Sequence, residues 1–210
     1  MYKSLLIIIS ILALVLTLFP PNPSIAASNV TGKKIVIDPG HGGTDTGTTE
    51  CSTLVEKEAT LQIARILRDK LQADSAIVTM TRDSDVGLGN TERANIANAA
   101  GGQALVSVHL NGSTNHSANY TKVLYGKRIK DLEFANVMHS AQYPFLGIAE
   151  KKTTNFASGV LLKSDMPAVI TESVFLSNTT ECTKLSDGTA RQTEIAQSMY
   201  NGLNEWFRTH

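Results

Sequence analysis

Short apolar runs alternate with segments of helical period along most of this chain, and that alternation restricts the possible folds more than any other feature. Four apolar runs predict strands, at residues 34–37, 76–81, 104–108 and 168–171, and the first of them is expected to be buried. Two shorter runs predict additional short strands, at residues 123–125 and 160–162. These elements account for the part of the chain that follows the first thirty or so residues.

Apolar side chains recur at helical spacing between and after these strands. The recurrence predicts helices at residues 56–71, 92–100, 131–142 and 189–207. Thr91 is placed to cap the second of them, and Gly101 is placed to end it. Strands that alternate with helices are typical of an α/β layer with a mostly parallel sheet. With 210 residues, the chain is expected to contain a single domain.

The N-terminal residues have a different composition from the rest. Lys3 precedes an apolar run at residues 5–19, prolines follow it, and Ala26 and Ala27 suit a signal-peptidase site. This pattern predicts a secretory signal at residues 1–27. An uncleaved membrane anchor is the alternative, but the run of about 15 residues is shorter than the roughly 20 that a spanning helix requires.

Export sets the expected environment of the mature chain. A short polar lead-in is expected at residues 28–33 and the folded domain at 34–210, with no stable membrane span after cleavage. The protein would then lie in the periplasm, in the cell wall or outside the cell. Cys51 and Cys182 could form a disulfide in such an environment, or they could remain two unpaired thiols.

Charge patterning does not support a nucleic-acid partner. The 19 lysine and arginine residues balance 19 aspartate and glutamate residues, and no basic run of five or more residues occurs. A strongly anionic partner is equally unsupported.

Three potentially reactive side chains fall at the ends of predicted strands. His41 follows the first strand, His109 follows the third, and Glu172 follows the strand at 168–171. In open α/β sheets, ligands bind outside the carboxyl ends of the strands. We therefore expect these side chains to share one edge of the sheet.

The residue types at this edge suit a metal-dependent hydrolase. Zinc accepts imidazole and carboxylate ligands, and a catalytic site uses three of them, which His41, His109 and Glu56 could supply. Glu172 could take a proton from water and deliver it to a leaving nitrogen. Each residue also has an ordinary structural interpretation. The histidines could be a loop residue and a buried strand residue, Glu172 a solvated strand end, and Glu56 a capping-box partner of Thr53.

Several segments, in order along the chain, resemble the zinc-dependent N-acetylmuramoyl-L-alanine amidases of the amidase-3 family. The run at residues 34–43, KIVIDPGHGG, resembles the family's opening motif, and Glu56-Lys57-Glu58 follows at the usual distance. Further resemblance lies at residues 81–83, 92–98, 107–111 and 167–178. The similarity therefore extends from about Lys34 to the C-terminus.

The resemblance implies a fold, a site and an activity. His41, Glu56 and His109 correspond to the family's zinc ligands, and Glu172 corresponds to its catalytic glutamate. The implied fold is a single α/β domain with a twisted six-stranded sheet between helices. The implied reaction is hydrolysis of the amide that joins the lactyl group of N-acetylmuramic acid to the L-alanine of the stem peptide.

This chain also departs from the family pattern. Leu110 stands where the second histidine motif usually has alanine, and Val174 stands where a glycine often follows the residue after the glutamate. The stretch at residues 112–158 matches weakly. Because that stretch would border the cleft, substrate preference is where this chain is expected to differ most.

Additional polar residues have alternative interpretations. Asp38 and Asn111 could orient the histidines or form turns, and Arg82 could bind a substrate carboxylate or anchor a loop. Asn155 could touch substrate. His139 is interpreted as an exposed helix residue.

The leading hypothesis is thus a zinc amidase that acts on peptidoglycan in wall remodelling or cell separation. A zinc peptidase that cuts within the stem peptide would use the same metal chemistry. A wall-binding protein without catalysis is the third hypothesis. The sequence does not identify a protein activator.

Overall fold

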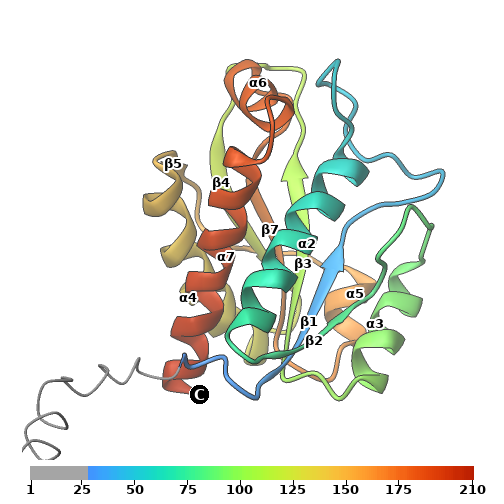
Figure 1. Cartoon of the computed structure of the whole chain (residues 1–210), viewed down its shortest axis with the longest axis vertical. Helices are drawn as coiled ribbons and strands as arrows, with labels where there is room; N and C mark the ends of the chain where they lie inside the picture. The colour runs from blue at the N-terminus through green and yellow to red at the C-terminus, as the bar shows by residue number, and fades with distance from the viewer. Residues whose placement is uncertain (1–27) are drawn as a thin grey trace, which may run out of the picture.

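One mixed sheet forms the centre of the domain (Figure 1). The computed structural model describes residues 28–210, so the predicted signal at residues 1–27 lies outside the described residues. Within the described part, seven strands follow the order β2-β1-β3-β7-β4-β5, and β6 also pairs with β4. The strands are β1 (Lys34–Pro39), β2 (Ile77–Met80), β3 (Ala104–Asn111), β4 (Tyr120–Tyr125), β5 (Ala149–Glu150), β6 (Thr154–Asn155) and β7 (Ala168–Phe175).

Helices cover both faces of this sheet. They are α2 (Glu56–Ala73), α3 (Asn90–Ala99), α4 (Lys130–Leu146), α5 (Gly159–Lys163), α6 (Thr179–Ser186) and α7 (Ala190–Thr209). In Figure 1, α7 lies between α2 and α4 in one layer, while α3 and α5 pack together on the opposite face. No helix among residues 28–210 combines the length and the apolar character needed to cross a membrane.

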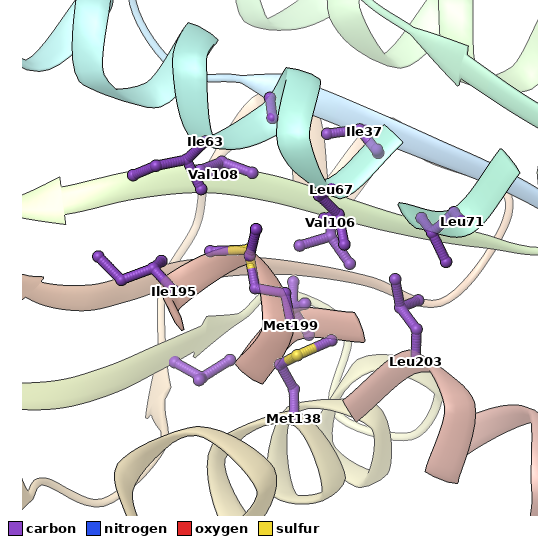
Figure 2. Packing of buried hydrophobic residues seen from close by; sticks show 14 of the residues in the cluster. Ile37, Ile63, Leu67, Leu71, Val106, Val108, Met138, Ile195, Met199 and Leu203 are labelled. Atoms are coloured by element: carbon purple, nitrogen blue, oxygen red, sulfur yellow. The ribbon is translucent and has the colours of Figure 1, made fainter. Parts of the chain in front are cut away.

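Alternate residues of the central strands face opposite helical layers. Ile37 and Val106 point into the larger core, where they pack with side chains of α2, α4 and α7 (Figure 2). Their neighbours Val36 and Leu105 face the smaller core beneath α3 and α5. Strands buried on both faces read as continuous apolar runs, which explains why these strands could be predicted from the sequence.

Most strand pairs are parallel. β1 pairs in parallel with β2 and β3, and β3 pairs in parallel with β7, whereas β4 runs antiparallel to β7. The predicted α/β fold with a mostly parallel sheet is therefore confirmed. The strand number is seven rather than six, because the two-residue strands β5 and β6 each pair with β4.

Three local predictions are wrong. The apolar run at residues 160–162 belongs to helix α5, not to a strand, and helix α6 was not predicted. Thr91 lies inside α3, whose N-cap is Gly89. His139 is 5% exposed and therefore buried, because it faces inward on α4.

The two cysteines form a disulfide. Cys51 lies in the segment that leads into α2, and Cys182 lies on α6, at a sequence separation of 131. The bond therefore ties the approach to Glu56, the first residue of α2, to the C-terminal part of the chain.

Candidate active site

The predicted metal-binding side chains converge at the carboxyl edge of the sheet. His41 follows β1, His109 lies near the end of β3, and Glu56 is the first residue of α2. Glu56 Oε1 lies 3.0 Å from His41 Nε2 and 3.1 Å from His109 Nδ1. The two imidazole rings meet edge to face with centroids 4.7 Å apart. One carboxylate oxygen thus stands between two imidazole nitrogens.

This donor set fits a zinc ion. One atom from each of His41, Glu56 and His109 lies within 4.8 Å of the others. Two imidazoles and one carboxylate form a set that zinc accepts readily, and three protein ligands leave a position free for water or substrate. The donor atoms of these three residues therefore fit the zinc ion on which a metal-dependent hydrolysis would depend.

Glu56 does not belong to a capping box. The N-cap of α2 is Val55, which makes no side-chain cap, and the Thr53 hydroxyl instead lies 2.7 Å from Ser186 Oγ. The Glu56 carboxylate turns toward the site, where it accepts hydrogen bonds from two backbone amides. Thr48 N–H donates at 2.9 Å and Leu110 N–H donates at 3.1 Å.

The charges within this group reinforce one another. Burial alone would raise the pKa of Glu56, but its contacts with His109 and His41 hold that pKa far below its usual range. Burial likewise tends to lower the pKa of His41, yet the carboxylates of Glu56 and Asp45 raise it above its ordinary value. Glu56 is therefore an anion at any physiological pH.

Two buried arginines fix the loop that carries His41. The backbone of His41 is left-handed, with φ of 59°, which a non-glycine residue adopts at a cost. Arg93 donates to the His41 carbonyl at 2.7 Å, and Arg82 donates to the Gly40 carbonyl at 2.8 Å. Gly40 must lack a side chain, because a Cβ there would lie 2.3 Å from the His109 ring.

The Asp38 carboxylate contacts residues at the edge of the sheet and does not contact a histidine. Its buried carboxylate accepts hydrogen bonds from Thr81 at 2.5 Å, Ser107 at 2.6 Å and Arg93 at 2.7 Å. These donors come from three different segments. Asp38 therefore holds the ends of neighbouring strands together beneath the site and does not contact a histidine, the first of its two predicted roles.

The acidic residue that contacts His41 is Asp45 rather than Asp38. Asp45 Oδ1 lies 2.9 Å from His41 Nδ1, on the ring edge opposite Glu56. In a metal-binding imidazole, the ring nitrogen that does not bind the metal usually donates its N–H hydrogen bond to such an acceptor. The only sequence signal for Asp45 was an acidic residue four positions after the histidine in a glycine-rich loop.

Glu172 lies at the same edge of the sheet, on the neighbouring strand β7. It stands on β7 directly opposite His109 of β3. Its residue surface is only partly exposed, and its Oε2 is buried without a hydrogen-bond partner among residues 28–210. Burial raises the pKa of Glu172 to about 7. A carboxyl group with that pKa can both accept and release a proton near neutrality.

Comparison with known proteins identifies the family. The model of the family described as Amidase_3, N-acetylmuramoyl-L-alanine amidase, matches residues 35–205. The chain belongs to this family. The matched range contains every residue of the site described above.

Individual relatives support the same family assignment. N-acetylmuramoyl-L-alanine amidase CwlM of Bacillus licheniformis is 35% identical over 179 residues, which are 83% of this chain and 68% of that protein. Probable cell wall amidase LytH of Staphylococcus epidermidis is 32% identical over 190 residues. That match covers 90% of this chain but only 63% of the length of LytH.

Solved structures share the fold. The catalytic domain of CwlV, an N-acetylmuramoyl-L-alanine amidase from Bacillus (Paenibacillus) polymyxa var. colistinus, superposes with a TM-score of 0.78 at 30% identity. That match covers 85% of this chain and 99% of the domain. The N-acetylmuramoyl-L-alanine amidase from Clostridium difficile 630 gives a TM-score of 0.79 at 30% identity, with 85% and 98% covered.

The site of this amidase opens into a cleft of about 560 Å³. His41, Glu56, His109 and Glu172 all line it, and Phe156, which is 50% exposed, contributes an aromatic side chain. The cleft therefore brings all four predicted site residues to one solvent-accessible space.

The remaining predicted residues have structural contacts. Asn111 Nδ2 donates to the Glu172 carbonyl at 3.4 Å and so contacts the backbone of β7 rather than a histidine. Asn155 donates to the carbonyls of Tyr125 and Gly126 and does not line the cleft. Arg82 is buried and anchors the loop, the second of its two predicted roles.

Proposed function

We propose that this amidase hydrolyses the amide bond between N-acetylmuramic acid and the L-alanine of the peptidoglycan stem peptide, with His41, Glu56 and His109 holding a zinc ion. The convergence of three donor atoms within 4.8 Å carries this proposal, since the three residues come from separate segments of the chain. Glu172 is proposed as the catalytic residue, because it stands beside that cluster in the same cleft.

The proposed metal would supply the electrophilic part of the chemistry. A zinc ion held by these residues would polarise the amide carbonyl and lower the pKa of the attacking water to about 7. The protein would supply the orientation. The contact between Asp45 and His41 Nδ1 leaves the Nε2 lone pair of a neutral imidazole facing Glu56 and the metal position.

Glu172 is suited to move the proton. In the proposed reaction its carboxylate accepts a proton from the attacking water and then delivers it to the leaving nitrogen of the peptide. The buried Oε2 has no hydrogen-bond partner among the described residues, so it is free to accept. A pKa of about 7, caused by burial, matches a group that must be deprotonated for the first step and protonated for the second.

The proposal includes the setting of the reaction. We place the catalytic domain at residues 34–210, after a secretory signal at residues 1–27 and a short lead-in at 28–33. The protein would act in the periplasm, the cell wall or outside the cell, where peptidoglycan lies. The similarity to LytH, a probable cell wall amidase, supports this setting by analogy.

Analysis of digestion products tests the function. Purified protein is incubated with peptidoglycan, and the soluble products are identified by mass spectrometry. Release of intact stem peptides that begin with L-alanine supports the amidase. Cleavage between two amino acids would replace it with a stem-peptide peptidase. Binding to the wall without any cleavage would indicate a binding protein.

Glu172→Gln provides the matched control. The substitution preserves size and removes the titratable group, so the variant should bind zinc at the same stoichiometry and release no stem peptide. Removal of metal by a chelator should stop digestion by the wild type, and added zinc should restore it. A chelated protein with undiminished activity would contradict the metal-dependent mechanism.

A further inference from the structure

Three residues form one row across three adjacent strands at the floor of the cleft. Glu172 of β7 stands opposite His109 of β3 on one side and opposite Lys122 of β4 on the other. Each is partly exposed between two buried neighbours, so all three side chains point from the sheet into the same space. The order across the sheet is His109, Glu172, Lys122.

Lys122 is the free cation of this row. The other cationic side chain that lines the cleft is Arg93, whose guanidinium group is already committed to the Asp38 carboxylate and to backbone carbonyls. Lys122 forms no hydrogen bond or ion pair with any side chain in the described part of the chain. Burial raises the pKa of Glu172, and the nearby charge of Lys122 opposes that rise.

The row also gives the cleft a direction. Glu172 is proposed to protonate the leaving nitrogen, so that nitrogen must lie beside Glu172 when the amide breaks. The zinc ligands lie on one side of Glu172 and Lys122 on the other, about 5 Å further across the sheet. A leaving peptide that is directed away from the zinc ligands would therefore extend over Lys122.

The distances favour a contact near the start of the peptide. A chain advances roughly 3.5 Å per residue, so a group on the residue after L-alanine lies about 5–8 Å from the scissile nitrogen. The ammonium group of Lys122, on a flexible four-carbon stem, reaches that region. An ammonium group that is partly buried and makes no hydrogen bond or ion pair among residues 28–210 favours a carboxylate there.

We propose that Lys122 is a specificity-determining residue that binds a free carboxylate on the second residue of the stem peptide. This inference rests on the proposed amidase function and adds to it the chemical class of substrate that the cleft prefers. It also accounts for a cation in a stretch of the chain, residues 112–158, that resembles the family only weakly.

A matched pair of substrates tests the proposal. N-acetylmuramoyl-L-alanyl-γ-D-glutamyl-L-lysine carries a free α-carboxylate on its second residue, and N-acetylmuramoyl-L-alanyl-D-isoglutaminyl-L-lysine carries an amide in its place. In both substrates the γ-carboxyl group of the second residue is bound to the lysine, so only the first has a free carboxylate there. The quantity measured is the ratio of kcat/KM for the acid to kcat/KM for the amide. We expect the wild type to prefer the acid about tenfold, as for one partly screened charged contact.

Substitutions locate that preference. Lys122→Gln should reduce the ratio to about one, Lys122→Arg should retain most of it, and Lys184→Gln should leave it unchanged. Lys184 offers the same change of charge at an exposed position on α6, outside the cleft. An effect of Lys122 on Glu172 alone would change both rates equally and would leave the ratio intact.

The outcomes separate this inference from the proposed function. Equal rates on both substrates in the wild type, with cleavage at the muramoyl amide, would overturn the role of Lys122 and preserve the amidase. A preference that survives Lys122→Gln would do the same. Failure of the wild type to cleave either muramoyl amide would refute the amidase function itself.

Discussion

Replacing Glu172 with glutamine should make the metal-free protein more resistant to alkaline unfolding. Burial raises the pKa of Glu172 from 4.5 to about 7 in the folded state. The unfolded chain therefore loses this proton first as the pH rises, and unfolding releases a proton between the two pKa values. The contribution of Glu172 to stability is complete below pH 4.5 and is lost as the pH rises through about 7.

The magnitude follows from the size of the shift. A difference of about 2.5 pKa units corresponds to about 3 kcal/mol at 1.36 kcal/mol per unit. Glutamine at this position cannot ionise, so the variant avoids this loss. The free energy of unfolding of the variant, minus that of the wild type, should rise by about 3 kcal/mol between pH 4.5 and pH 8.

Urea unfolding of the chelated proteins at several pH values measures this difference. Every other titratable group is common to the two proteins, so the comparison isolates the ionisation of Glu172 together with its coupling to the neighbouring charges. A constant offset between the two proteins reflects the altered hydrogen bonding of the amide and does not bear on the prediction. A difference that stays flat from pH 4.5 to pH 8 would show that Glu172 is not held in a desolvated position.

Three further predictions concern the scaffold of the site. Glu56→Gln should weaken zinc affinity at least tenfold in a chelator competition while α2 stays intact, because the carboxylate contacts both imidazoles; unchanged affinity would leave Glu56 with a structural role only. Gly47→Ala should also weaken zinc affinity, since its Cβ would lie 2.5 Å from Glu56 Oε2. Gly188→Ala, at a positive φ with open space around it, is the control that carries the backbone strain alone, and equal effects of the two would contradict this reasoning. Replacing Cys51 and Cys182 with serine should lower the free energy of unfolding by about 5 kcal/mol, the value expected for a loop closed over 131 positions, and a melt that does not shift would contradict it.

The centre of the sheet could be predicted because β1, β3 and β7 are buried on both faces. Runs such as residues 35–37 and 104–106 are continuously apolar, which is the pattern of a strand buried on both faces. The run at residues 160–162 has the same composition but is too short to show a period. Its helical state is set by packing of Val160 and Leu161 against the sheet, which no local pattern reveals.

The site could be predicted in outline for a related reason. Strand ends in a parallel sheet meet at one edge, so His109 and Glu172 had to lie near each other once their strands were recognised. Local pattern could not decide the role of Glu56, since the first turn of a helix suits either a cap or a ligand. The contacts of Glu56 with His41 and His109, which lie on other segments of the chain, decide its role.

The residues that sequence reasoning misjudged depend on contacts across the fold. Asp38 lies near the end of β1 and Asp45 lies in the loop that follows it, and only the folded structure shows that Asp45 is the one that reaches His41. His139 lies on a helix whose amphipathic pattern is weak, so its buried face could not be recognised. In each case the information lies in tertiary packing rather than in spacing.

Anomalous diffraction at the zinc absorption edge, from crystals of the zinc-loaded protein, tests the central claim most directly. We predict one strong peak in the cleft, coordinated by the imidazoles of His41 and His109 and the carboxylate of Glu56, with Glu172 close by but not bound. A peak elsewhere, or an ion that lacks the Glu56 carboxylate, would contradict the account.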